Sequence, residues 1–248
     1  SDIPFIFVEK FDGLVDLLNE RGQYTVNILG NSEKNCVVKG VKAIPFADTE
    51  KVAEAIADAD AAFTSVGGKN LGDLVPLLVK GIERKAEKGG NLNVVTCENW
   101  KLPATILKNG VEEAISEEAK EYFHTHVGIT EAVIMRSAIE SSPELLKQDP
   151  LIVNVQDFWE LPVDASRIVG SLPDIKGLKL IESFTGFLER KFYTYNAANG
   201  TTSYLGALLG YEKIADAAHD ERILKILDGV YQETAQALSK KHHFPLEE

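Results

Sequence analysis

Short apolar segments of strand length alternate with amphipathic segments along the first part of the chain, and this alternation constrains the fold most strongly. Between the strand-like runs, apolar residues recur at helical spacing. Val52, Ile56 and Ala59, for example, fall on one face of a predicted helix that begins at Asp48. Such alternation is typical of a parallel sheet covered by helices on both faces. The strands predicted in this part are residues 3–8, 24–29, 61–66 and 92–97.

The alternation weakens after residue 100. Further strands are predicted at residues 127–136 and 151–155, and from Glu182 onward the pattern is almost wholly helical, apart from a break at Asn199 and Gly200. We therefore predict an α/β domain with a mostly parallel sheet at residues 1–180, followed by an all-α domain at residues 181–248.

Charge and cysteine content argue against several functional classes. The chain has 26 Lys and Arg residues against 38 Asp and Glu residues, a net charge of −12, whereas nucleic-acid binding requires a basic surface. No apolar run approaches the ~18 residues of a membrane span, and the first residues do not resemble a secretory signal. Two cysteines, Cys36 and Cys97, are too few for a disulfide framework and are typical of reduced thiols, so a cytoplasmic location is expected.

The histidines do not predict a metal site. His124 and His126 are two residues apart and lack a neighbouring cysteine or carboxylate set, and His242 and His243 are no better as ligands. We expect no bound metal.

Candidate binding residues follow predicted strands, at the edge where ligands bind in open α/β sheets. Glu9 either accepts hydrogen bonds from ribose hydroxyls or faces solvent. The segment from Gly67 to Gly72 has Lys69 in place of the second glycine of a phosphate loop, so it is either a later turn near a cofactor or a plain turn. Asn99 either donates to an alkoxide or bonds its own backbone in a turn.

Lys191 lies within an aromatic stripe. At ~100° per residue, one helical face carries Phe184, Leu188, Lys191 and Tyr195. Asn196 and Asn199 lie towards one flank of that face. Burial would disfavour the ammonium form and lower the pKa of the lysine towards the range of a base. The alternative is a lysine whose ammonium group reaches water.

Several blocks occur in one order that identifies a resemblance. Lys191 and Asn196 match the first two members of a Lys-x4-Asn-x2-His signature, and Asn199 stands at the histidine position. The other blocks are Phe7-Val8-Glu9, Thr64-Ser65-Val66-Gly67, Cys97-Glu98-Asn99, His126-Val127-Gly128 and the stretch from Pro173-Asp174-Ile175 to Leu178. Together they resemble the polyol-specific long-chain dehydrogenase family, and within it the mannitol-1-phosphate 5-dehydrogenase branch.

The resemblance implies a Rossmann-like domain followed by a helical domain, with NAD(H) and a polyol as ligands and no metal. It implies that Lys191 is the general base and that the amides of Asn99 and Asn196 stabilise the alkoxide. Asn199 can hydrogen-bond a substrate oxygen but, unlike histidine, cannot acquire charge near neutral pH.

On the cofactor side, the resemblance implies that Glu9 binds the ribose and that Val66, Gly67 and Asn99 lie at the edge of the cofactor. The first strand and the glycine loop of the family would precede residue 1, and its helical domain would continue past residue 248. We therefore expect both domains to be incomplete.

The leading hypothesis is oxidation of a sugar alcohol or its phosphate, of the type that converts mannitol 1-phosphate to fructose 6-phosphate. The alternatives are a hexuronate reductase of the same family and a non-catalytic member that binds a sugar phosphate or a partner protein. Lys69, Arg136 and Arg190 are equivalent candidates for an anion anchor, and the oligomeric state is not predicted.

Overall fold

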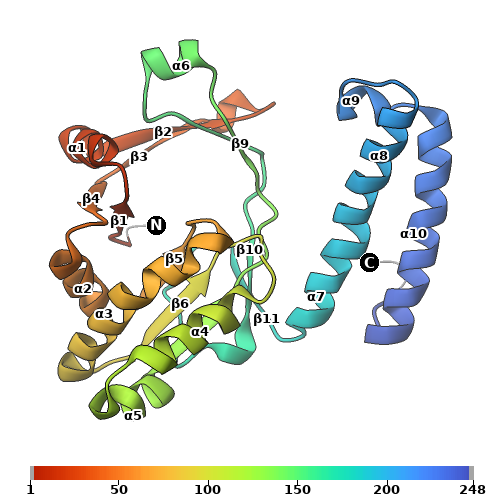
Figure 1. Ribbon diagram of the computed structural model, residues 1–248. Helices are drawn as coiled ribbons and strands as arrows, with labels where there is room; N and C mark the ends of the chain where they lie inside the picture. The colour runs from red at the N-terminus through yellow and green to blue at the C-terminus, as the bar shows by residue number, and fades with distance from the viewer. Residues whose placement is uncertain (1–2, 246–248) are drawn as a thin grey trace. The chain divides into compact units, whose positions relative to one another are not determined.

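The chain folds into two compact units, Ser1–Glu182 and Ser183–Glu248, and the computed structural model describes residues 3–245 (Figure 1). Each unit has a hydrophobic cluster of its own. None of the helices within residues 3–245 combines the length and the apolar content that crossing a bilayer demands.

A parallel three-stranded sheet forms the centre of the first unit. Its strands, in the order in which they pair, are β5 (Ala61–Thr64), β6 (Leu92–Thr96) and β7 (Val127–Glu131). Thr64 pairs with Thr96, and Thr96 with Glu131, so the carboxyl ends of the three strands align. Every residue of β6 is buried, including the polar Asn93 and Thr96, as expected for the central strand of a parallel sheet that is covered on both faces.

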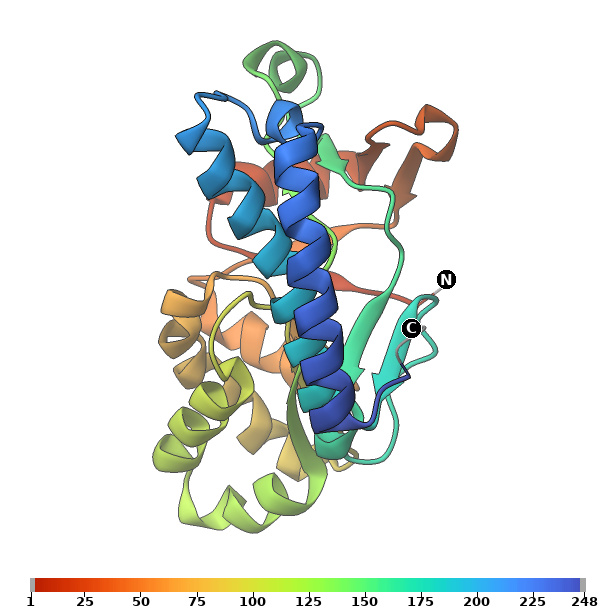
Figure 2. The same ribbon diagram turned by 90° about the vertical axis from the view of Figure 1, so that its right-hand side faces the viewer.

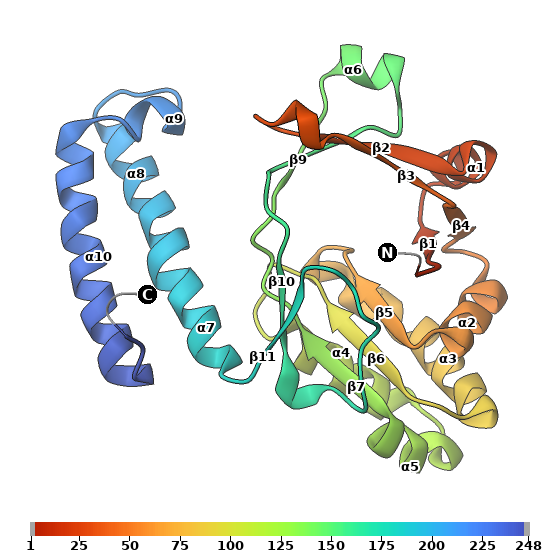
Figure 3. The same cartoon turned by 180° about the vertical axis from the view of Figure 1, so that it is seen from behind.

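Helices pack around this sheet, as Figure 3 shows from behind. They are α2 (Thr49–Asp58), α3 (Val75–Lys88), α4 (Pro103–Ala114) and α5 (Glu117–His126). Leu78 and Ile82 of α3 and Leu107 of α4 form the main core together with the apolar residues of the strands. The prediction that helices cover a mostly parallel sheet is confirmed, although the sequence reading missed α4 and α5.

The remaining strands form three smaller sheets. Parallel pairs are made by β1 (Ile6–Glu9) with β4 (Lys42–Pro45), and by β10 (Leu161–Asp164) with β11 (Leu178–Ile181). A mixed sheet has the order β3 (Cys36–Lys39), β2 (Gln23–Ile28), β9 (Val153–Val155) and β8 (Ala138–Ile139), with α6 (Pro143–Gln148) between β8 and β9 in the chain.

Two local sequence features define the ends of helices. The helix α1 (Asp12–Arg21) ends at Gly22, whose φ of 60° is left-handed and whose N–H donates to the carbonyl of Leu18. Asp48 caps α2 by accepting a hydrogen bond from the N–H of Lys51. The strand predicted at residues 127–136 is shorter than expected, because after Glu131 the chain leaves β6 and Ala132 bridges to Val163.

Gly128 allows a loop to pack closely on β7. A Cβ at this position would lie 2.3 Å from Oδ1 of Asn93 and 2.6 Å from the carbonyl oxygen of Arg167. The buried Asn93 amide exchanges hydrogen bonds of 2.9 Å with the N–H and the carbonyl of Val169. Any larger residue at position 128 would push this loop off the sheet.

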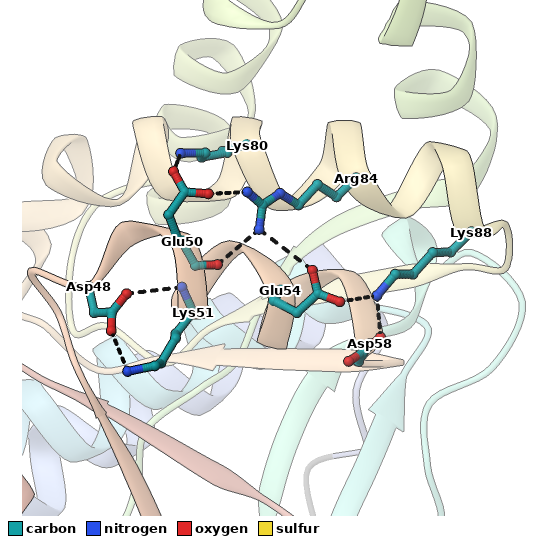
Figure 4. A network of polar contacts seen from close by, with 8 residues as sticks. All are labelled: Asp48, Glu50, Lys51, Glu54, Asp58, Lys80, Arg84 and Lys88. Carbon is teal, nitrogen blue, oxygen red and sulfur yellow. Dashed lines mark hydrogen bonds and ion pairs between the residues drawn. The ribbon is translucent and has the colours of Figure 1, made fainter.

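Acidic side chains of α2 face basic side chains of α3 across their contact (Figure 4). The ion pairs are Glu50 with Lys80 and Arg84, Glu54 with Arg84 and Lys88, and Asp58 with Lys88. Such exposed pairs contribute little individually. Beneath them, the buried Lys85 donates a 3.2 Å hydrogen bond to the carbonyl of Ala57, near the end of α2, where backbone carbonyls lack partners in their own helix.

In the second unit, helical backbone runs continuously through α7 (Phe184–Lys191), a π turn (Phe192–Asn196) and α8 (Ala197–Leu208). After α9 (Ile214–Ala217), the long helix α10 (Glu221–His242) packs beside α8 and α7, as Figure 2 shows.

The predicted break at Asn199 and Gly200 is wrong, because both residues lie inside α8. A glycine inside a helix costs about 1 kcal/mol, and the packing of α8 on α10 overrides this preference. The helix ends at Leu208 instead, before Gly210, whose φ is +85°.

We predict that Lys85→Ala lowers the free energy of unfolding by about 1–3 kcal/mol, because it removes a buried aliphatic chain and leaves the carbonyl of Ala57 without its donor. Urea denaturation measures the change. Lys108→Ala, on an exposed position of α4, is the control. Equal losses in the two variants would contradict the role given to Lys85.

Candidate functional site

The second unit carries Lys191, Asn196 and Asn199 on a helix that is widened by one residue. In an α-helix, Lys191 and Asn196 would point about 140° apart, because they are five residues apart. The π turn, Phe192–Asn196, lies between them, and such a turn holds one residue more than an α turn. It therefore removes about 100° of rotation. From Lys191, Asn196 is five residues away and Asn199 is eight residues away. With the extra residue in the turn, these spacings become equivalent to four and seven residues of a regular α-helix, which place side chains on the same face. The three side chains therefore share one helical face.

Burial destabilises the ammonium form of Lys191. The residue is half-buried, and burial lowers the pKa of its ammonium group. Its Nζ also lies 5.3 Å from the centroid of the Phe192 ring, a cation–π contact that acts in the opposite direction. Asn196 and Asn199 are exposed, and their amides donate hydrogen bonds without titrating. This face therefore combines a lysine of lowered pKa with two neutral hydrogen-bond donors.

The aromatic stripe predicted around Lys191 is only partly formed. Phe184 is buried, but Tyr195 is 64% exposed. The π turn explains the difference, because the extra residue rotates Tyr195 away from the line through Phe184 and Lys191.

Glu189, which sequence reasoning did not single out, ties the end of α7 to α10. Its carboxylate accepts hydrogen bonds from Nζ of Lys241 at 2.8 Å and pairs with Nε2 of His242 at 2.7 Å. Lys241 and then His242 hold the pKa of Glu189 below its usual range. This contact fixes the helix two residues before Lys191.

In the first unit, the buried carboxylate of Glu98 fixes the loop that follows β5. It accepts hydrogen bonds from Oγ1 of Thr64 at 3.1 Å, from the N–H of Val66 at 2.8 Å and from the N–H of Gly67 at 2.9 Å. The sequence reading gave Glu98 no role. The available signal was an acidic residue directly after a fully buried strand, where a carboxylate needs partners.

Val66, Gly67 and Asn99 meet at the carboxyl edge of β5 and β6. Gly67 has a φ of +80°, which favours glycine. The Trp100 side chain covers Gly68, because a Cβ on Gly68 would lie 2.2 Å from Cγ of the indole. Asn99, between Glu98 and Trp100 in the chain, is exposed. The structure thus brings these three predicted residues together.

Glu9 lies at the carboxyl end of β1, directly before α1. Its Oε1 accepts hydrogen bonds from the N–H of Lys10 at 2.7 Å and of Phe11 at 3.0 Å. Both bonds involve the same oxygen, so the turn fixes the carboxylate through Oε1 while Glu9 remains half-buried.

A second buried carboxylate belongs to the last residue of β7. Glu131 is 6% exposed, and burial raises its pKa, whereas Arg167, 3.6 Å away, opposes that shift. Arg167 also lies 3.4 Å from Asp164. Sequence reasoning missed this group because its members come from separate strands.

The three candidate anion anchors differ in their surroundings. Arg136 lies over the Trp159 ring at 4.5 Å and donates from Nε to the carbonyl of Gln156 at 3.0 Å. Its Nη2 is buried and has no hydrogen-bond partner within residues 3–245. Arg190 lies 5.0 Å from the centroid of the Phe187 ring, and Lys69 is exposed.

The histidines of the first unit have aromatic or acidic neighbours. His126 stacks on Tyr122 with ring centroids 4.8 Å apart, and His124 lies 3.5 Å from Glu112. Across the described part of the chain, no three His, Cys, Asp or Glu side chains form a group that could hold a metal ion.

Comparison with known proteins identifies two family models along the chain. A model described as the mannitol dehydrogenase Rossmann domain matches residues 1–177, and one described as the mannitol dehydrogenase C-terminal domain matches residues 183–248.

Two solved structures share the fold. A D-sorbitol dehydrogenase in substrate-free form has a TM-score of 0.76 at 17% identity, covering 89% of this chain and 55% of its own. Mannitol 2-dehydrogenase from Pseudomonas fluorescens, solved as a ternary complex with NAD and D-mannitol, has a TM-score of 0.69 at 14% identity, covering 88% of this chain and 54% of its own. The chain therefore spans about half the length of these two proteins.

We predict that Gly68→Ala displaces the Trp100 indole, because the new Cβ would overlap the ring and Cβ of Trp100. In a Trp159→Phe background, where Trp100 is the remaining tryptophan, its fluorescence should shift to longer wavelength. Gly72→Ala, with open space around its Cβ, should leave the emission unchanged. An unshifted spectrum for Gly68→Ala would contradict the packing of Trp100 on this loop.

Proposed function

Because this chain belongs to the mannitol dehydrogenase family, we propose that the protein carrying it transfers hydride between NAD(H) and a sugar alcohol. The observation that carries the proposal is the single helical face that holds Lys191, Asn196 and Asn199, with the pKa of the lysine lowered by burial. We assign dinucleotide binding to residues 1–180 and the base to residues 181–248, and we place the protein in the cytoplasm.

Lys191 acts as the general base in this proposal. Its neutral amine accepts the proton of the substrate hydroxyl, while the carbon that bears the hydroxyl loses a hydride and becomes a carbonyl. NAD⁺, when bound, accepts that hydride at the nicotinamide ring. The amides of Asn196 and Asn99 donate to the oxygen as negative charge develops on it, and Asn199 orients a neighbouring hydroxyl.

We assign NAD binding to Glu9, Val66, Gly67 and Asn99. The Glu9 turn is fixed through Oε1, so Oε2 is the oxygen that we assign to the ribose hydroxyls, in keeping with the role of acidic residues at this strand end in dinucleotide-binding folds. Val66, Gly67 and Asn99 supply the wall at the neighbouring strand ends.

The substrate proposed is a polyol phosphate of the mannitol 1-phosphate type, with Arg136 as the phosphate anchor. The unpartnered Nη2 of Arg136 supports this choice, because a buried guanidinium nitrogen without an acceptor is costly and a phosphate oxygen would satisfy it. A hexuronate would offer a carboxylate to the same group.

A non-catalytic member that binds a sugar phosphate or a partner protein is the second candidate. It is favoured by Asn199, which cannot provide the charge of the histidine that the family signature carries at this position. Calorimetric titration with NADH separates the two candidates, because only the dehydrogenase requires the cofactor.

We predict that Lys191→Ala lowers kcat for polyol oxidation by about 10²- to 10⁴-fold, the contribution of a general base. Lys225→Ala, an exposed residue of α10, is the charge-matched control and should leave the rate unchanged. In the unmutated protein, a lowered pKa means that the neutral amine forms at a lower pH than for an ordinary lysine. NADH formation should therefore rise with pH through that pKa and then level off. Unchanged turnover in Lys191→Ala would remove the assigned base.

We predict that Arg136→Met raises KM for mannitol 1-phosphate by about 10- to 100-fold, through loss of a charge-assisted hydrogen bond. KM for mannitol should change much less. Steady-state kinetics on both substrates measures the ratio. Equal changes for the two substrates would show that Arg136 does not bind the phosphate.

A further inference from the structure

We propose that Glu98 is the positioning residue of the cofactor edge. Its carboxylate holds the Val66–Gly67 loop as a rigid wall for an uncharged part of NAD and, through the same bonds, turns Asn99 towards the substrate. The inference rests on the proposed function, and it adds to that function a residue to which neither the sequence reading nor the proposed mechanism gives a role.

The first step concerns the hydrogen bonds of Glu98. Within residues 3–245, its three hydrogen-bond partners are all donors, namely the hydroxyl of Thr64 and the N–H groups of Val66 and Gly67. The two backbone donors bond to different oxygens, Oε1 and Oε2. The side chain of Glu98 therefore accepts at both of its oxygens. The bonds are charge-assisted and buried, so they hold the loop more firmly than neutral hydrogen bonds would.

The second step concerns what the loop offers to a ligand. Backbone N–H groups are the usual donors to phosphates in glycine-rich turns, but those of Val66 and Gly67 already donate to Glu98. The carbonyls are also engaged, since Nδ2 of Asn70 donates to Val66 at 2.6 Å and the N–H of Asn70 donates to Gly67 at 2.8 Å. The Glu98 carboxylate behind Val66 and Gly67 disfavours an anion at these two residues, whereas the exposed Lys69 lies further along the chain. The part of the cofactor that it fits is therefore a ribose or a ring, and not the pyrophosphate.

The third step concerns Asn99, which lies between two residues anchored to the same loop. Glu98 points inward to Val66 and Gly67, and Trp100 packs on Gly68. With both neighbours held, the backbone of Asn99 has little freedom, and its side chain lies on the exposed side. Releasing Glu98 would release Asn99 as well.

The test is Glu98→Gln, which keeps the size of the side chain but directs an amide N–H₂ at one of the two backbone N–H groups. Hydrogen exchange of the Val66 and Gly67 amides, followed by NMR without cofactor, should accelerate by about 10- to 100-fold. In kinetics, KM for NAD should rise and kcat should fall by about tenfold each, because Asn99 is no longer held in place. Glu113→Gln, the same change at an exposed position of α4, should alter neither.

Thr64→Val is the milder second variant, in case Glu98→Gln does not fold. It removes one donor to Glu98, so the accelerated amide exchange, the rise in KM for NAD and the fall in kcat should all be smaller than in Glu98→Gln. If the Val66 and Gly67 amides exchange at the normal rate in the folded variants, Glu98 does not hold this loop.

The cofactor arm of the test separates this inference from the proposed function. If the unmutated protein does not bind NADH, the proposed function fails. If it binds NADH but Glu98→Gln leaves KM and kcat unchanged, the positioning role fails alone. A shift of the Val66 and Gly67 amide resonances on addition of inorganic pyrophosphate would overturn the assignment of this loop to an uncharged part of the cofactor.

Discussion

One additional residue in a helical turn decides which side chains of the second unit can act together. The π turn at Phe192–Asn196 converts a spacing that scatters polar groups around a helix into one that aligns them. Two further contacts brace this part of the helix. Oγ1 of Thr194 donates a 2.6 Å hydrogen bond to the carbonyl of Arg190, at the start of the wider turn. Glu189 braces the preceding turn against α10.

The first unit fixes its candidate residues by a different means, a buried charge. Within residues 3–245, Glu98 accepts hydrogen bonds from a hydroxyl and two backbone N–H groups, and from no basic side chain. An ion pair in this place would orient one side chain, whereas donors from the end of β5 and from two adjacent residues of the following loop orient the loop itself. In both units, neutral amides are presented on a backbone that other residues hold. This suits groups that must stabilise a developing negative charge without titrating.

Much of the fold could be predicted from local signals. The buried run at β6, the cap at Asp48 and the stop at Gly22 each depend on a few neighbouring residues. The helix α4 could also have been predicted, because Ala104, Leu107 and Val111 recur at helical spacing and are fully buried. The sequence analysis missed this pattern, which directly follows the turn at Asn99 and Trp100.

The candidate site could be predicted only in part. Lys191 and Asn99 stand out by residue type and position. The hydrogen-bond register of the π turn, however, leaves no trace in apolar spacing. The wrong break at Asn199 and Gly200 has another cause, because packing of α8 on α10 overrides the local preference of glycine. The role of Glu98 depends on Thr64, 34 residues earlier in the chain. This contact forms only when β5 and β6 have paired, so a local sequence pattern cannot predict it.

The continuity of the helix also bears on how Lys191 can serve as a base. A lysine at a true helix C-terminus would be stabilised as ammonium by unpaired carbonyls, and that would raise its pKa. Here the backbone remains helical through Phe192 and beyond, so those carbonyls face further helix and not a free end. The nearest acidic neighbour in the chain, Glu189, is already matched by Lys241 and His242. Burial lowers the pKa of Lys191. Because position 199 is an asparagine and not the histidine of the family signature, the residue at this position does not titrate together with Lys191.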